Sequence, residues 1–166
     1  MMGGRRQGGP GAPQRAEADG GGRSMEESFS DRLGRGSWVA PVAELVGAFP
    51  VSFGEGKAVF EMEAGRRHHN PMGTVHGGIL CDIADAAMGF AFASTLGPGE
   101  TFTTLELKIN FLRPVYEGRL TASARVAHRG RTIGLVECDV ANAEGMPVAR
   151  GSSTCQVLRG EAAGGR

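Results

Sequence analysis

Apolar and polar residues recur with two different periods along this chain, and the change of period divides it into elements. Residues 51–53 and 57–64 have the short apolar patterns of two strands, joined by a glycine-containing turn at 54–56. Residues 76 to about 95 are apolar on nearly every side of a helical projection. This pattern predicts a long helix that is buried rather than laid on a surface, and it ends at Gly-Pro-Gly, residues 97–99.

Only strands are predicted after that helix. Leu105, Leu107, Ile109 and Phe111 alternate with polar residues, which is the period of a strand with one buried face. The same alternation recurs at residues 120–126, 136–140 and about 148–158, with turns at 129–131 and 144–145 between them. Two strands, a buried helix and a run of antiparallel strands predict an α+β fold in which a sheet wraps around one long helix.

Both ends of the chain are poor in residues that a core could bury. Residues 1 to about 25 are dominated by Gly, Arg, Pro and Gln, so ordering them costs more conformational entropy than contacts return. We expect disordered tails at residues 1–25 and 159–166 around a single domain at residues 26–158. Within that domain, residues 30–33 and 41–47 are predicted to form short helical segments, with Trp38 packed against the core.

Composition argues against several functional classes. The chain has 18 basic and 18 acidic residues and no basic stripe interleaved with aromatic residues, so nucleic acid is not an expected partner. No apolar run is long enough to cross a bilayer and the N-terminus lacks the apolar centre of a secretory signal, so we expect a cytoplasmic protein without a membrane partner. Cys81, Cys138 and Cys155 are odd in number and far apart, which favours reduced core thiols. The histidines lack a compact ligand spacing, so no metal site is expected.

The stretch from Asn70 to Asp85 carries the most informative chemistry. Gly77 and Gly78 open the predicted helix, so their backbone N–H groups are expected to be unpaired and able to point at a negatively charged or polarised oxygen. Asp85, nine residues after His76, is embedded among apolar residues. Burying a carboxylate without a partner is energetically costly, so we expect this one to have a specific role. Donors at a helix start and a carboxylate deeper in the same helix are the two halves of an acyl-transfer site.

Each of these residues also has a structural interpretation. Paired glycines commonly permit close packing of a helix on a sheet. Asp85 is alternatively a core carboxylate satisfied by backbone donors, and His76 is expected to be structural, with its ring hydrogen-bonded to the loop rather than acting as a base. Cys81 lacks an evident activating base, so we expect it in the core.

Asn70, His76-Gly77-Gly78 and Asp85, with Asn110-Phe111-Leu112-Arg113-Pro114 downstream, resemble the hotdog-fold acyl-CoA thioesterases, in particular the phenylacetate-degradation-associated (PaaI-like) branch. The resemblance covers roughly residues 38–158. It implies that Gly77 presents its backbone N–H to the thioester carbonyl and that Asn70 lies near the same oxygen or the attacking water. It also implies that Asp85 comes across a dimer interface and serves as nucleophile or general base.

The resemblance further implies a short hydroxyl on the first strand after the helix, and Thr104 aligns best with it. The alternation, however, places Thr104 on the Glu106 side, opposite Leu105 and Leu107. Either the strand twists before Leu105, or Thr103 is the residue that matters.

Arg129 and Arg131 flank a glycine at a predicted turn, which is ordinarily a solvated hairpin end. In the resembled family the corresponding turn lies near the nucleotide end of coenzyme A, and guanidinium groups suit phosphates. Arg129, Arg131 and Gly78 are therefore the expected contacts for coenzyme A. No dinucleotide-binding glycine pattern occurs, so coenzyme A is expected as part of an acyl-CoA substrate and no separate cofactor is expected.

The sequence therefore predicts a homodimer or homotetramer that hydrolyses acyl-CoA thioesters, because a lone sheet leaves an open edge that a second copy can pair with. Two alternatives remain. One is an acyl-CoA hydratase or dehydratase on the same fold, although no Asp and His stand five residues apart as that branch usually requires. The other is a module that binds acyl-CoA without turnover, against which an intact Asp85 argues.

Overall fold

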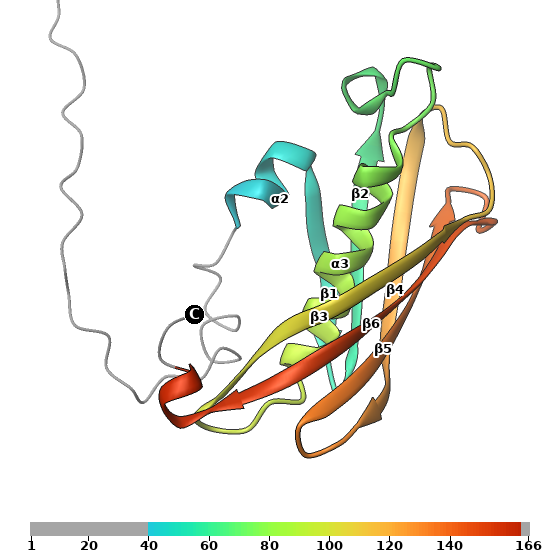
Figure 1. The fold of residues 1–166 in the computed structure, drawn as a ribbon. Helices are drawn as coiled ribbons and strands as arrows, with labels where there is room; N and C mark the ends of the chain where they lie inside the picture. The colour runs from blue at the N-terminus through green and yellow to red at the C-terminus, as the bar shows by residue number, and fades with distance from the viewer. Residues whose placement is uncertain (1–39, 164–166) are drawn as a thin grey trace, which may run out of the picture.

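The structure is a computed structural model that describes residues 40–163, so the predictions for Trp38 and for residues 30–33 lie outside the described residues. The elements in chain order are α2 (Pro41–Val46), β1 (Ala48–Gly54), β2 (Lys57–Ala64), the 3-10 helix η1 (Arg66–His68), α3 (Gly77–Ala93), β3 (Glu100–Phe111), β4 (Gly118–Arg129), β5 (Ile133–Asn142), β6 (Pro147–Arg159) and the 3-10 helix η2 (Gly160–Ala163) (Figure 1). The predicted α+β fold, a sheet wrapped around one long helix, is confirmed.

The strands form one antiparallel six-stranded sheet in the order β1-β2-β4-β5-β6-β3. The strand that follows α3 in the chain, β3, does not join β2 but pairs with β6 at the far edge. This crossover carries the chain across the helix, so α3 lies within the curve of the sheet (Figure 1). The two edges of the sheet are therefore β1 and β3.

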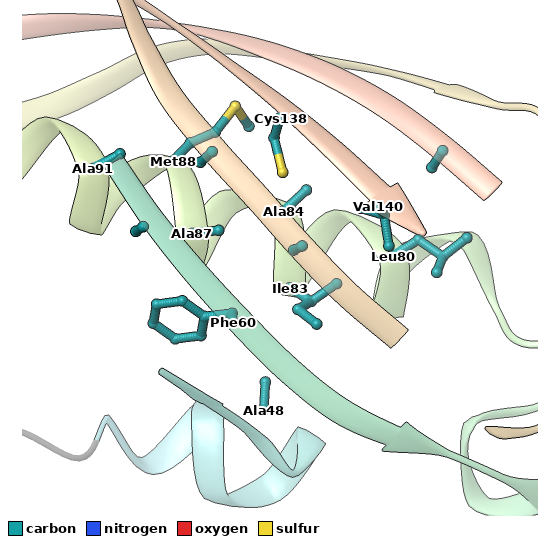
Figure 2. Packing of buried hydrophobic residues seen from close by; sticks show 14 of the residues in the cluster. Ala48, Phe60, Leu80, Ile83, Ala84, Ala87, Met88, Ala91, Cys138 and Val140 are labelled. Carbon is teal, nitrogen blue, oxygen red and sulfur yellow. The ribbon is translucent and has the colours of Figure 1, made fainter. Parts of the chain in front are cut away.

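The core lies between α3 and the concave face of the sheet. Ala84, Ala87 and Ala91 lie on the sheet-facing side of the helix and are fully buried, so the helix backbone approaches the strands closely. Bulkier side chains such as Phe60 and Met88 fill the remaining space (Figure 2). Burying one large apolar side chain stabilises a fold by about 1.5–3 kcal/mol, so this contact is the main source of stability.

Helix α3 is not buried all round, contrary to the sequence-based expectation. Asp82 and Asp85 are exposed in the single chain, and Gly78 and Gly89 on the same stripe are partly exposed. The apolar pattern was dominated by alanines, which are compatible with a partly open helix face as well as with a core. The open stripe means that one side of α3 is left without cover by the chain's own sheet.

Strand β3 also departs from simple alternation. Thr104 pairs with Cys155 and Glu106 with Thr154, so Leu105 is an extra residue at a β-bulge and is 55% exposed. The predicted buried face starting at Leu105 is wrong at that residue, because a bulge shifts the parity of the side chains on either side of it. Leu107 and Ile109 pack against the core as predicted.

The two sheet edges differ in how open they are to pairing. Strand β1 has seven residues, contains Pro50 and has a bulge at residue 51. Strand β3 has twelve residues and no proline, and it exposes Phe111 as well as the bulged leucine. Each edge strand has one bulge, but short length and proline also block edge pairing and occur only in β1, so β3 is the more open edge.

The end of the domain extends beyond its predicted limit. Strand β6 runs through Arg159, and Gly160–Ala163 form η2, within the segment that was expected to be a tail.

All three cysteines are free thiols, with Cys138 and Cys155 buried and Cys81 partly exposed. Of the helices in residues 40–163, none has the length and apolarity needed to cross a membrane.

Gly134 allows the closest approach of strand to helix, and its replacement tests this packing. A Cβ at Gly134 would lie 2.1 Å from Cε2 of Phe92, which is fully buried and has no room to move. We expect Gly134→Ala to lower the free energy of unfolding by about 1–3 kcal/mol, measured by urea denaturation. Gly65→Ala is the control, because nothing lies within 4 Å of a Cβ there and its φ of −165° is extended. Equal stability of the two variants would contradict the packing described here.

Candidate functional site

The N-terminus of α3 has one backbone donor without a partner. His76 is the N-cap residue, and its ring Nδ1 accepts a hydrogen bond of 2.9 Å from the N–H of Gly78. The N–H of Ile79 donates to the His76 carbonyl at 3.0 Å. Within residues 40–163, the Gly77 N–H makes no hydrogen bond, so it is the one first-turn amide of these three that is free to bind an oxygen.

This arrangement corrects one expectation and agrees with another. Gly78 was expected to offer a free N–H, but the His76 ring occupies it, so Gly78 is not available as a ligand donor through its amide. The His76 ring does make a backbone hydrogen bond, as its structural interpretation expects. Because Nδ1 accepts, the neutral ring carries its proton on Nε2. The His-x-Gly spacing was the signal, since an N-cap side chain bonds the amide two or three residues later.

Asn70 organises the loop that leads to this helix end. Its side-chain oxygen accepts from the Met72 and Thr74 N–H groups at 2.9 and 3.3 Å, and its Nδ2 donates to the Thr74 hydroxyl at 2.9 Å. A primary amide has two N–H donors, so one remains available. Asn70 and Gly77 both line a hollow of about 350 Å³. The structure thus brings together these two predicted site residues.

The walls of this hollow are mostly apolar. They include Leu80 from α3 and residues 111–115 from the end of β3 and the segment after it. Phe111 packs on the helix start, because a Cβ at Gly77 would lie 2.8 Å from the Phe111 ring. Gly77 therefore permits close packing and also presents a free amide, and the two interpretations of the glycine are compatible. An apolar hollow with the free Gly77 amide and the remaining N–H of Asn70 in its lining suits an uncharged carbonyl compound.

Asp85 lies on the open stripe of α3. By accessible surface it is exposed in the single chain, yet neighbouring atoms crowd its carboxyl, and this partial desolvation raises the pKa of Asp85 above the ordinary value. The negative charge of Asp82 raises it further. Within residues 40–163, no hydrogen bond or ion pair reaches the Asp85 carboxyl. The interpretation of Asp85 as a buried, satisfied core carboxylate is therefore wrong.

One chain does not bring Asp85 and Gly77 together. Eight residues separate them on the same helix, and at about 1.5 Å of rise per residue their backbones are roughly 12 Å apart along the axis. A group that attacks or deprotonates at a bound carbonyl must lie about 3 Å away. Within a single copy, the free amide and the free carboxylate thus cannot act on the same bound carbonyl.

The bulge in β3 determines where Thr104 lies. Phe102 contacts Phe92 of α3 with ring centroids 5.3 Å apart, and Thr104, two residues on, faces the same side. Its cross-strand partner Cys155 is buried, and Cys155 is close enough to Asp85 for the carboxylate to raise the pKa of its thiol. The strand therefore does change its facing at Leu105, and Thr104 rather than Thr103 lies on the helix side with Asp85.

The two arginines of the β4–β5 turn differ in their contacts. Arg129 donates through Nη2 to Glu100 at 2.9 Å, donates through Nη1 to the Gly130 carbonyl, and lies over the Phe92 ring at 5.3 Å. The Gly97 N–H, followed by Arg159 and Arg129, lowers the pKa of the Glu100 carboxyl. Arg129 thus supports the fold at the C-terminal end of α3.

Arg131 is exposed, and its guanidinium has no hydrogen bond or ion pair within residues 40–163. It remains a candidate ligand for a phosphate.

Cys81 is not activated as a nucleophile, because burial and the charges of Asp82 and Asp85 raise the pKa of its thiol. Sequence reasoning missed Cys155 as a neighbour of Asp85, since only the strand pairing places it there.

Comparison with known proteins gives consistent matches. The Thioesterase superfamily profile matches residues 72–149. The chain is 34% identical over 114 residues to acyl-coenzyme A thioesterase PaaI of Escherichia coli, covering 67% of this chain and 79% of that protein. It is 34% identical over 89 residues to 1,4-dihydroxy-2-naphthoyl-CoA hydrolase of Listeria monocytogenes, covering 54% of this chain and 72% of that protein.

The fold agrees with these matches. The solved structure of the E. coli PaaI protein from the phenylacetic acid degradation operon superposes with a TM-score of 0.70 and 28% identity. The superposition covers 79% of this chain and 91% of that chain.

The His76 cap can be tested by replacement. We expect His76→Ala to lower the free energy of unfolding by about 0.5–2 kcal/mol, because the Gly78 N–H loses its acceptor. His76→Asn is the matched variant, since asparagine is a strong N-cap residue and should restore most of the loss. Thermal denaturation followed by circular dichroism measures both, and an alanine variant as stable as the wild type would show that the cap contributes nothing.

Proposed function

This chain belongs to the hotdog-fold thioesterases of the PaaI-like branch and is a thioester hydrolase, and from that membership we propose that it hydrolyses acyl-CoA thioesters at a site shared by two copies of the chain. The observation that carries the proposal is the free N–H of Gly77 at the start of α3, in an apolar hollow. A donor fixed in this way stabilises the negative charge that develops on a thioester oxygen when the carbonyl is attacked. Named relatives that act on CoA thioesters support the substrate class.

The second half of the site is the Asp85 carboxylate of another copy. In one chain Asp85 is too far from Gly77, has no hydrogen-bond or ion-pair partner within residues 40–163, and lies on a stripe that the chain's own sheet leaves open. The long and open β3 edge supports pairing with a second β3, which would bring a neighbouring α3 alongside. In that assembly Asp85 of one copy attacks the carbonyl or deprotonates a water next to the Gly77 amide of the other.

Asn70 and Arg131 have supporting roles in this proposal. The remaining N–H of Asn70 is available to the carbonyl oxygen or the attacking water in the same hollow as Gly77. Arg131, with an unpaired and exposed guanidinium, binds a phosphate of coenzyme A. Arg129, whose two terminal nitrogens donate to Glu100 and to the Gly130 carbonyl, contributes by holding the turn rather than by contacting the substrate.

The amide of Gly77 can be removed without disturbing the helix. Gly77 is the first helical residue and its N–H is unpaired, and His76 has extended backbone angles, so proline fits there. We expect Gly77→Pro to reduce kcat for acyl-CoA hydrolysis by about a hundredfold or more relative to Gly77→Ala. Both variants add a Cβ next to Phe111, which is exposed and can shift, but only proline deletes the donor. Release of free thiol from a panel of acyl-CoA thioesters is the readout.

A shared site has a distinctive outcome when inactive variants are mixed. Asp85→Asn should be folded but inactive, and so should Gly77→Pro. Refolding them together should restore about a quarter of the wild-type sites, because half of the dimers are mixed and each has one intact site. No recovery on mixing, with both parents folded, would contradict the shared site. No thiol release by the wild type from any acyl-CoA would contradict hydrolysis and favour binding without turnover.

The pH dependence reports on Asp85. The carboxylate must be deprotonated to act, and its pKa is raised, so activity should be lost as the pH falls through a value above the ordinary range for aspartate. Asp82→Asn removes the neighbouring charge and lowers the pKa of Asp85, which should shift the acidic limb of kcat/KM to lower pH. Glu55→Gln in the exposed β1–β2 turn makes the same change of net charge and should leave the limb in place. Identical profiles for both variants would argue against Asp85 as the titrating group.

A further inference from the structure

Phe111 is a large apolar side chain that the fold leaves half exposed beside the free amide, and the mechanism above gives it no role. It is the last residue of β3 and is 54% exposed. Its cross-strand partner Ala149 is fully buried in the core, and paired residues point to the same face of a sheet. Phe111 therefore lies on the side of the sheet that faces α3, where it lines the hollow of about 350 Å³ together with Gly77.

The Phe111 ring meets Gly77 with its outer end. A Cβ at Gly77 would lie 2.8 Å from Cζ of the ring and 3.2 Å from both Cε1 and Cε2. The backbone of Gly77 thus lies directly behind the end of the ring, so the ring cannot retreat toward the helix. The free N–H belongs to the same residue, with its nitrogen about 1.46 Å from the α-carbon that the ring contacts. A carbonyl oxygen bound to this N–H therefore lies beside the ring.

The walls of the hollow indicate which part of the substrate lies against the ring. A thioester carbonyl joins an acyl group to the pantetheine arm of coenzyme A, and that arm carries amide groups that need hydrogen-bond partners when they are buried. Beside Phe111, the hollow is lined by the apolar side chains of Leu80, Leu112 and Val115. Its volume of about 350 Å³ is near the lower end for ligand pockets, so it suits one part of an acyl-CoA. The acyl group is the part that matches apolar walls.

We propose that Phe111 is a specificity-determining residue, whose ring occupies the space beside the carbon next to the thioester carbonyl and so selects acyl groups that are unbranched at that carbon. This inference rests on the proposed function and narrows its substrate class. A methylene group at that carbon leaves room for the ring, whereas a methyl branch meets the ring end, which Gly77 holds from behind. One misplaced methyl group in an apolar pocket changes kcat/KM by about 10- to 200-fold.

The test uses pairs of acyl-CoA isomers that differ only in branching. The pairs are butyryl-CoA with 2-methylpropionyl-CoA, and hexanoyl-CoA with 2-methylpentanoyl-CoA. The wild type should prefer the straight isomer of each pair by about tenfold or more in kcat/KM. Phe111→Ala should remove most of this preference, because it clears the space beside the reacting carbonyl. Phe111→Leu keeps an apolar side chain of smaller size and should give an intermediate preference.

Leu112→Ala is the matched control. Leu112 is the next residue, is 49% exposed and lines the same hollow, but the three atoms nearest a Cβ at Gly77 all belong to Phe111. This variant should keep the preference for straight isomers within about twofold of the wild type, since it leaves the ring in place. Size-exclusion chromatography should give the same assembly for all three variants, which separates a change of specificity from a change at the β3 edge.

The outcomes separate this inference from the function on which it rests. A wild type that hydrolyses both isomers equally well, or prefers the branched one, would overturn the role of Phe111. An unchanged preference in Phe111→Ala with a higher KM for both isomers would place the ring against the pantetheine arm and would also overturn it. A wild type that releases no thiol from any acyl-CoA would instead overturn the proposed function.

Discussion

The packing of α3 into the curved sheet is the contact on which the rest of this molecule depends. Three fully buried alanines, at positions 84, 87 and 91, bring the helix backbone close to the strands. A helix held in this way is rigid along its length, and its rise separates Gly77 from Asp85 by roughly 12 Å. In the proposed mechanism, the scaffold that gives the chain its stability thus prevents one copy from completing the site alone. Under that proposal, association of two copies is a requirement of the chemistry.

At the start of the same helix, stability and chemistry are divided among adjacent residues. His76 satisfies the amide of Gly78 with its ring and that of Ile79 with its carbonyl, which leaves the Gly77 amide free. An unpaired donor at the surface costs little, because water can bond it until a ligand arrives. The apolar walls of the adjoining hollow make that donor more effective once a substrate excludes the water.

The sequence was sufficient to predict the elements whose patterns have a single period. Strand β2 was predicted with its observed bounds, and α3 within about two residues at each end. The bulge at Leu105 could not be predicted, because an alternating pattern looks the same whether or not one residue is skipped. The exposure of Asp85 was missed since alanines on a helix do not distinguish a core from an open face.

The sequence predicted which residues form the candidate site better than it predicted the contacts that those residues make. Asn70 and Gly77 do line one hollow. The hydrogen bond from Gly78 to the His76 ring and the pairing of Arg129 with Glu100 depend on side-chain geometry that residue types do not determine.

The two edges of the sheet also limit how many copies can join by strand pairing. If two copies join through β3, the combined sheet ends in β1 on both sides, where the strand is short and Pro50 lacks a backbone donor. Growth by strand addition then stops after one junction, and the chain forms a closed particle instead of a fibre.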